Sequence, residues 1–173
     1  MKLTGLFFLL IATLASCSTP PETTFTQWGL QVAVPEGWEL VDEEDYGENS
    51  YYIAIEQRGL TTSGVVTIIW FDEEYDLEEF NQSIMTSITE EIGNDVIIRD
   101  SDRDFGKHST YAQEYLFSFL DMPHTGVMHT FYLDGKTLCI GQQWANEDVQ
   151  NVKAGFDRIS ETLKLGEEFV AAD

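Results

Sequence analysis

The chain has 173 residues and a mass of 19.7 kDa, and its 31 Asp and Glu residues against 9 Lys and Arg residues give a formal net charge of −22. Such a charge argues against a nucleic-acid binder, because affinity for a phosphate backbone comes mainly from Lys and Arg. It argues equally against recruitment to anionic lipid by a basic patch. A hydrophobic content of 43% with 13% aromatic residues argues against intrinsic disorder, and the length suits a single domain.

Residues 1–17 are predicted to be a lipoprotein signal peptide. Lys2 precedes an apolar run over residues 6–12, which is too short to span a bilayer. The letters LASC at residues 14–17 form a lipobox, in which two small residues let the chain enter a peptidase and the Cys thiol accepts a diacylglycerol. We therefore expect a covalent lipid on Cys17 that holds the protein on a membrane. The alternative is an ordinary signal peptide with an incidental cysteine.

The segment after Cys17 is predicted to be a flexible tether over residues 18–27, because STPPETTFTQ is polar, contains two prolines and shows no periodicity. A tether of this length reaches at most about 33 Å, so the domain stays close to the membrane. Ser18 resembles an outer-membrane sorting signal of Gram-negative bacteria, which favours a location on the outer membrane, facing the periplasm. Residues 28–165 form the single predicted domain, and residues 166–173 form a loose tail.

The first part of the domain is predicted to be β-structure. Strands are expected over residues 30–34, 51–56 and 65–71, where β-branched and aromatic residues concentrate. Residues 35–37 (PEG) end the first strand and a short continuation follows. Residues 42–49 are predicted to be an acidic loop.

A helix is predicted to begin after Asp76, whose carboxylate can cap it, and Glu79 three residues later completes a capping-box pattern. Apolar residues recur at helical spacing as far as Ile92, and Gly93 with Asn94 ends the helix. The single apolar stripe implies that one face of this helix packs against a sheet.

Four strands and a second helix are predicted to follow. The strands cover residues 95–99, 109–119, 126–133 and 136–144, with a loop over residues 122–125 and a tight turn at residues 134–135. Asn146 is expected to cap the second helix, whose apolar stripe ends at Leu163. Strands combined with two one-sided helices predict an α+β fold, a central antiparallel sheet flanked by helices.

Short motifs and the order of the elements resemble the PsbP-like superfamily, which includes bacterial PsbP-like and DcrB-like lipoproteins. Residues 34–38 (VPEGW) match the entry to that domain, residues 105–107 (FGK) are similar to the turn before its long strand, and the order of elements agrees over residues 28–165. The resemblance implies a central antiparallel sheet flanked by helices and a protein that binds partners rather than an enzyme. It implies no functional residue, because residues 34–38 match only as a structural turn and a core aromatic.

Asp100, Asp102 and Asp104 are candidate metal ligands because their spacing is that of the first oxygens of a calcium loop. The rest of the loop departs from that pattern: Phe105 stands where the glycine belongs, and Tyr111 stands where a bidentate Glu belongs. A charged turn is therefore favoured, and weak binding of Ca²⁺ or Mg²⁺ stays open. No other cofactor is expected.

His124 and His129 do not form a predicted metal pair, because a separation of five residues places them on opposite faces of a strand. They are expected to be free histidines at loop edges. Cys139 is expected to be a buried, inert thiol, since it lies in an apolar stretch and Cys17, the other cysteine, is assigned to the lipid.

A partner surface is predicted from one aromatic residue and one acidic run. Trp144 ends a predicted strand and is expected to be exposed. The run Asp42, Glu43, Glu44 and Asp45 has no structural explanation beyond solvation of a loop, and it could hold a loosely bound cation or meet a partner. A solvated surface is the simpler interpretation of this run.

The sequence carries none of the common catalytic motifs: it lacks G-x-S-x-G, H-E-x-x-H, C-x-x-C, a P-loop and G-x-G-x-x-G. The favoured function is therefore a lipid-anchored, non-catalytic protein of a bacterial cell envelope that binds or helps to assemble another envelope protein. The alternative is a periplasmic protein that binds a small ligand or a divalent cation.

Overall fold

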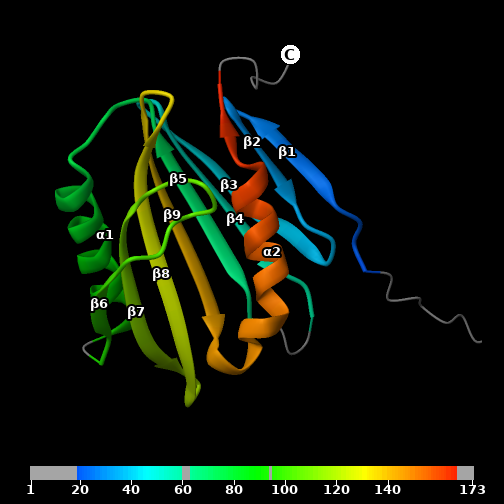
Figure 1. Ribbon diagram of the computed structural model, residues 1–173, viewed down its shortest axis with the longest axis vertical. Helices are drawn as coiled ribbons and strands as arrows, with labels where there is room; N and C mark the ends of the chain where they lie inside the picture. Colours follow the sequence, from blue (N-terminus) through cyan, green and yellow to red (C-terminus); the bar gives the residue numbers. More distant parts are fainter. Residues whose placement is uncertain (1–18, 60–62, 94, 167–173) are drawn as a thin grey trace, which may run out of the picture.

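The computed structural model describes residues 19–59, 63–93 and 95–166, which form two antiparallel sheets and two helices (Figure 1). The predicted signal peptide with Cys17, Ser18 of the tether and residues 167–173 of the tail lie outside the described residues. The smaller sheet has the order β1-β2-β10, and the larger sheet has the order β3-β4-β5-β9-β8-β7-β6. The predicted α+β fold with a central antiparallel sheet is confirmed.

The strands of the smaller sheet are β1 (Thr23–Gln27), β2 (Leu30–Val34) and β10 (Lys164–Leu165). The strands of the larger sheet are β3 (Trp38–Gly47), β4 (Ser50–Gln57), β5 (Val65–Phe71), β6 (Ile97–Ser101), β7 (Tyr111–Phe119), β8 (Met122–Leu133) and β9 (Lys136–Ala145). The helices are α1 (Leu77–Ile92) and α2 (Val149–Thr162), and a short 3-10 helix (Asn146–Asp148) precedes α2.

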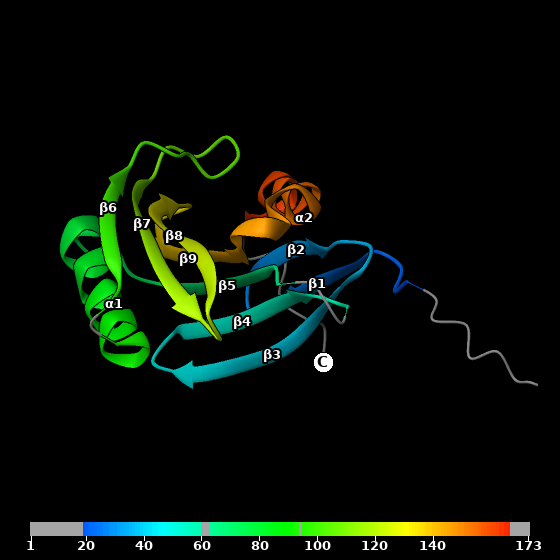
Figure 2. The ribbon, with the colours of Figure 1, turned by 90° about the horizontal axis from the view of Figure 1, so that it is seen from below.

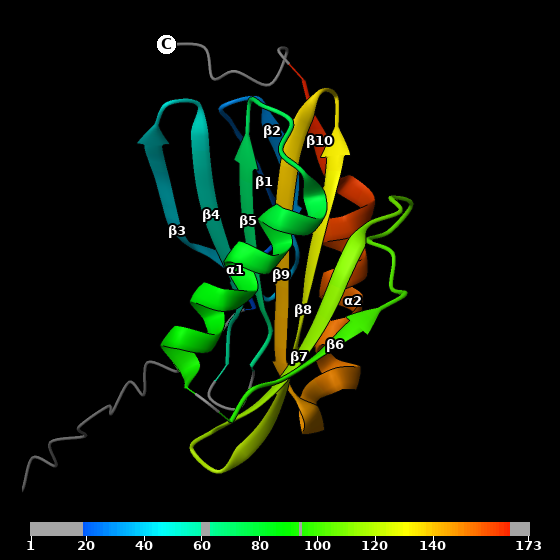
Figure 3. The same ribbon diagram turned by 90° about the vertical axis from the view of Figure 1, so that its left-hand side faces the viewer.

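The two helices lie on opposite faces of the larger sheet (Figures 2 and 3). Helix α1 packs against β7 and β8 on one face, and α2 packs with the smaller sheet against the other. Strand β5 shows how one strand serves both faces, since Val66, Ile68 and Trp70 enter the main core and Ile69 between them enters a second core under α1. We call these faces the α2 face and the α1 face.

The turn at residues 35–38 positions the aromatic centre of the main core, as the sequence predicts. The Trp38 N–H donates a hydrogen bond to the Pro35 carbonyl at 3.0 Å, and Gly37 takes the positive φ of +81° that a type II turn requires. The buried Trp38 ring lies so close to α2 that a Cβ on Gly155 would be 2.3 Å from it. The ring also packs against Phe156, with 5.5 Å between centroids.

Helix α1 begins and ends as predicted. The Asp76 carboxylate accepts a hydrogen bond from the Glu79 N–H at 2.9 Å, and the Gly93 N–H donates to the Thr89 carbonyl at 2.9 Å. Gly93 has a φ of +110°, a conformation that other residues rarely adopt, so the helix ends there.

The predicted tether is wrong over its second half, because Thr23–Gln27 forms strand β1 and pairs with β2. Phe25 is buried in the main core opposite Val32, which makes this segment part of the domain. Chain upstream of it is also attached to the fold, since the Gly37 N–H donates to the Pro20 carbonyl at 2.9 Å.

The predicted acidic loop is also wrong, because residues 42–47 form the outer half of β3 and pair with β4. Strand β3 is an edge strand, and exposed charges are compatible with an edge because they face water and discourage pairing with another chain. The turn that follows is tight, with positive φ values at Glu48 and Asn49.

Two further boundaries differ from the prediction. Residues 122–125, expected to be a loop, begin strand β8, and the turn before them is at Leu120 and Asp121, both with positive φ. Asn146 does not cap α2: it begins the 3-10 helix, and its side-chain oxygen accepts a hydrogen bond from the Thr125 hydroxyl at 2.7 Å. Sequence propensity misses both because the deciding contacts are pairing between neighbouring strands and a side-chain hydrogen bond, which local composition does not record.

Candidate functional site

The α1 face contains an open apolar groove of about 460 Å³ between α1 and the larger sheet. Figure 3 shows α1 crossing this face obliquely, with β3 at the free edge of the sheet. The groove is lined from α1 by Ile84, Ile88, Glu91 and Ile92, and from the sheet by Tyr52, Val65, Thr67, Ile69, Tyr115, Phe117, Phe119, Met128, Gly141 and Gln143. Glu91 is the single charged residue of this lining.

The helical wall of the groove comes from the apolar stripe that the sequence predicts. Ile84 and Ile88 are half-buried against the second core, whereas Ile92 at the end of α1 is exposed. The stripe therefore covers only part of the sheet face, and the remainder is left open to solvent. Sequence periodicity identifies such a stripe but does not show how much of it is covered.

Two glycines shape the floor of the groove. A Cβ on Gly126 would lie 2.0 Å from the Tyr115 ring, so the absence of a side chain there lets the ring lie flat on the sheet. A Cβ on Gly141 would lie 2.6 Å from the Thr67 hydroxyl. Burial raises the pKa of Tyr115, whose hydroxyl lies 3.5 Å from the Gln143 side-chain oxygen. The floor is thus apolar and uncharged.

Carboxylates stand along the side of the groove formed by β3 and β4. Directly paired residues of antiparallel strands share a face, so Asp42 lies on the face of Ala54, and Glu44 lies on the face of Tyr52, which lines the groove. Glu56 is paired with Val65, another lining residue. We call Asp42, Glu44, Glu56 and Glu91 the acidic rim.

Two tyrosines beside this rim have raised pKa values, and the rim carboxylates contribute to the shift after desolvation. Tyr46 and Tyr52 lie side by side, with 6.2 Å between ring centroids. The pKa of Tyr46 is raised by partial desolvation first and then by the carboxylates of Glu44 and Asp42. The pKa of Tyr52 is raised by desolvation and then by Asp42 among its neighbours.

The acidic run predicted as a partner surface is exposed but is divided between two faces. Asp42 and Glu44 belong to the acidic rim, whereas Glu43 pairs with Ile53 and Asp45 with Tyr51 on the opposite side of the sheet. The period of two along a strand causes this division. The prediction treats the run as one patch because it places these residues in a loop, where no alternation of faces applies.

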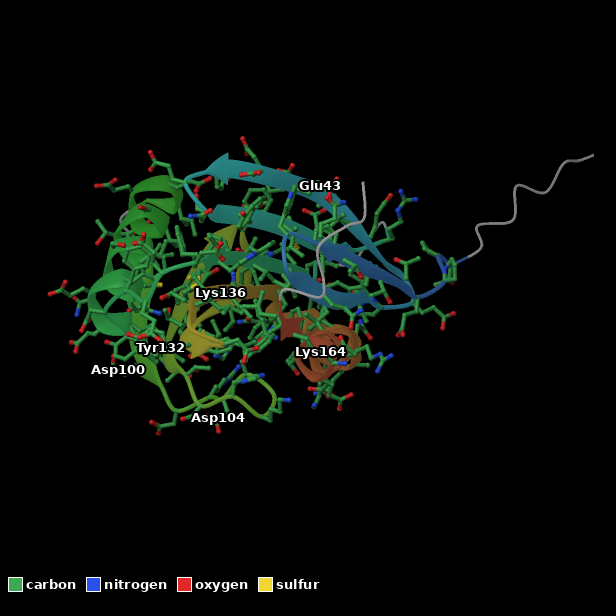
Figure 4. The ribbon with its side chains drawn as sticks, turned by 90° about the horizontal axis from the view of Figure 1, so that it is seen from above. Glu43, Asp100, Asp104, Tyr132, Lys136 and Lys164 are labelled. Atoms are coloured by element: carbon green, nitrogen blue, oxygen red, sulfur yellow. The ribbon has the colours of Figure 1, made fainter. Side chains whose placement is uncertain are left out.

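The predicted metal candidates are not brought together into a site. Asp100 lies in β6 and accepts a hydrogen bond from the Gln113 amide at 3.3 Å, while Asp102 and Asp104 are exposed in the loop that follows. Among the residues that the structure describes, no three His, Cys, Asp or Glu side chains are grouped so that they could hold a metal ion. Figure 4 shows Asp104 and Glu43 on opposite sides of the molecule.

Trp144 is buried, not exposed, and the prediction that it forms a partner surface is wrong. Only 6% of the residue is accessible, because α2 covers the end of β9 and the Phe156 ring packs 5.6 Å from it. The Arg103 guanidinium lies 5.8 Å from the Trp144 ring centroid. A small cavity of about 250 Å³ lies beside this pair.

The histidines lie in the body of a strand rather than at loop edges. His124 and His129 are both buried in β8, on opposite faces: His124 packs against Phe117, and His129 lies 3.1 Å from the Thr110 hydroxyl. Burial lowers the pKa of His129 to about 4, which keeps the ring neutral.

The prediction that Cys139 is a buried thiol is confirmed. Cys139 lies in the second core, 3.1 Å from the Met128 sulfur, and burial raises the pKa of its thiol to about 12. A thiol with this pKa stays protonated at neutral pH and is a poor nucleophile.

No protein-family model and no curated protein matches the sequence. Solved structures with a similar fold include the following two. The solution structure of cyanobacterial PsbP (CyanoP) from Synechocystis sp. PCC 6803 has a TM-score of 0.51 at 15% identity, covering 88% of this chain and 95% of that one. The crystal structure of LpqN, involved in cell envelope biogenesis of Mycobacterium tuberculosis, has a TM-score of 0.50 at 12% identity, covering 84% and 90%. The fold is PsbP-like, as the sequence resemblance implies.

Within the described ranges, neither helix is both long and apolar enough to cross a bilayer.

Proposed function

We propose that this protein is a lipid-anchored, non-catalytic component of a bacterial cell envelope, facing the periplasm from the outer membrane, that binds another envelope protein through the groove on the α1 face. The observation that carries the proposal is the groove itself, an open apolar surface with one charged lining residue. The envelope role of one PsbP-like neighbour, LpqN, supports the assignment.

The chemistry of the groove favours binding over catalysis. Its lining contains no His, Cys or Ser, the residues that most often act as bases or nucleophiles. It contains four aromatic residues and one methionine instead, which are enriched at protein interfaces. Phe119 of the lining is exposed, and Leu120 and Met122 in the same β7–β8 hairpin add further exposed apolar side chains. Contiguous exposed apolar surface of this kind marks an interaction site.

The anchor would hold the domain close to the membrane. The Pro20 carbonyl accepts a hydrogen bond from the Gly37 N–H, so the three residues from Cys17 to Pro20 can reach at most about 10 Å. Metabolic labelling with an alkyne fatty acid tests the anchor: the wild-type protein should be labelled in the membrane fraction and the Cys17→Ala variant should not. Equal labelling of both proteins would show that Cys17 is not the lipid site.

The binding role is tested by affinity purification of the full chain from solubilised membranes. Ile88→Asp places a charge inside the groove and should abolish recovery of the partner. Ile98→Asp, on β6 and outside the groove lining, makes the same chemical change at an exposed isoleucine and should leave recovery unchanged. The unfolding midpoint of each variant shows whether it is folded. Equal recovery with both variants would exclude the groove as the binding surface.

A small apolar ligand is the second candidate function, because about 460 Å³ falls within the range of small-molecule sites. Native mass spectrometry of the full chain released from membranes decides between the two. A bound small molecule that Ile88→Asp removes would favour this candidate, and a mass equal to that of the lipidated chain alone would exclude it.

A further inference from the structure

We propose that the groove on the α1 face takes a basic amphipathic segment of a partner protein, with apolar side chains of the segment against the groove and Lys or Arg side chains at the acidic rim. This inference rests on the proposed function and adds the chemistry of the partner. It is drawn from the distribution of charge around the groove.

The acidic rim approaches the groove from two sides. Asp42, Glu44 and Glu56 stand on β3 and β4, on the face of the lining residues Tyr52 and Val65. Glu91 comes from α1 and lines the groove itself. Because both sides carry the same charge, a segment lying between them meets carboxylates along both edges. Lys or Arg side chains on the segment would complement these carboxylates.

Among the residues that the structure describes, no Lys or Arg pairs with the rim. Arg58 is the only Lys or Arg between Lys2 and Arg99, a stretch that includes all four rim residues, and it pairs with Glu39. Ion pairs occur elsewhere in the described residues, as between Arg158 and Glu22 at 2.6 Å and between Lys153 and Asp157 at 2.5 Å. Within the described part of the chain, none of the four rim carboxylates takes part in an ion pair. The rim is therefore an unneutralised negative site.

Other occupants fit this charge poorly. A second copy of the chain would bring another net charge of −22, and like charges across an interface disfavour association. The last residues of this chain, 167–173 (EEFVAAD), are themselves acidic. Anionic lipid headgroups would be repelled by the rim. A basic segment is the occupant for which both the apolar floor and the charged edges are complementary.

The probe for this inference is a pair of synthetic amphipathic peptides of about four helical turns, one of Leu and Lys and one of Leu and Glu, each labelled with a fluorophore. The full chain, held in nanodiscs of zwitterionic lipid, is titrated against each peptide, and binding to empty nanodiscs is subtracted. The Leu/Lys peptide should bind and the Leu/Glu peptide should not. Raising the salt from about 0.1 M to about 1 M shortens the Debye length from about 10 Å to about 3 Å and should weaken binding.

Charge reversal at the rim locates the site. Asp42→Lys with Glu44→Lys should raise the Kd of the Leu/Lys peptide at least about tenfold. The matched control, Asp102→Lys with Asp104→Lys, makes the same change of charge in the exposed loop after β6, outside the groove lining, and should change the Kd less than about twofold. The neutral pair Asp42→Asn with Glu44→Gln should raise the Kd by an intermediate factor. It keeps the test valid if the charge-reversed pair does not fold.

Three results would overturn the inference: equal binding of the two peptides, no binding of either, or an equal loss in the rim and control variants. None of these results overturns the proposed function, which the affinity purification with Ile88→Asp and Ile98→Asp tests independently. A partner recovered with wild type and Ile98→Asp but not with Ile88→Asp would keep the groove as a binding surface and remove only the basic character of its partner.

Discussion

The two faces of the larger sheet differ in how completely they are covered. On the α2 face, helix and smaller sheet close over the main core, and a helix residue as small as Gly155 is needed to make room for the Trp38 ring. On the α1 face, the helix leaves a groove of about 460 Å³ and half-buried isoleucines. The close packing of the first face stabilises the fold, whereas the second face leaves apolar side chains open to solvent.

The faces also differ in charge. Helix α2 carries Lys153 and Arg158, each paired with a carboxylate, whereas α1 carries no Lys or Arg. The charge of the chain is therefore not balanced equally on the two helices, and the four carboxylates of the acidic rim, unpaired within the described residues, stand beside the open groove. The charge that argues against nucleic acid as a partner is the same charge that favours a basic protein segment.

The largest expected effect on stability comes from removing a buried side chain from the core on the α2 face. Trp38→Ala should lower the free energy of unfolding by about 3–5 kcal/mol, because it removes a buried aromatic ring and leaves a cavity. Tyr46→Ala on the α1 face, where 56% of the residue is exposed, should cost less than about 1 kcal/mol. Urea unfolding of both variants measures the contrast. Equal losses would mean that the α1 face stabilises the domain as much as the α2 face does.

A pH titration of stability gives the next largest effect. His129 is 1% exposed on the α2 face, and burial lowers its pKa from 6.5 to about 4 in the folded protein. Between those pH values the unfolded chain binds a proton that the folded chain does not, so stability falls as the pH falls. The contribution of His129 to this loss is about 3 kcal/mol. His129→Gln lacks that contribution and should show a shallower slope below pH 6.5. Parallel slopes would contradict the assignment.

The smallest expected effect on stability is at the acidic rim. Asp42→Lys with Glu44→Lys should change the free energy of unfolding by less than about 0.5 kcal/mol, since both side chains are exposed on an edge strand. The same pair should strongly weaken binding of the Leu/Lys peptide. A large destabilisation in urea would show that these residues serve the fold and not the surface.

Local features of this fold could be predicted from the sequence, and long-range ones could not. Asp76 and Glu79 form the cap of α1 because a capping box involves only neighbouring residues. The tight turn at residues 134–135 has the two positive φ values that Asp-Gly accepts readily. In contrast, the burial of Trp144 depends on α2 crossing the end of β9, which no local pattern records.

The candidate site likewise has parts that the sequence predicts and an arrangement that it does not predict. The isoleucine stripe of α1 and the acidic run at residues 42–45 are both evident in the sequence. Their meeting at one groove depends on the pairing of β3 with β4, which a charged run that resembles a loop conceals. The scarcity of Lys and Arg between Lys2 and Arg99, where Arg58 stands alone, is the sequence signal for an unneutralised surface.

The most direct measurement is photo-crosslinking in intact cells with a benzophenone amino acid placed at Ile88 in the groove or, as the control, at Gln150 on the exposed surface of α2. The account predicts that Ile88 crosslinks to a discrete envelope protein, through a segment that carries Lys or Arg among apolar residues, and that Gln150 does not. Crosslinks from both positions in equal yield, or none from Ile88, would contradict the claim that the α1 face is the binding face.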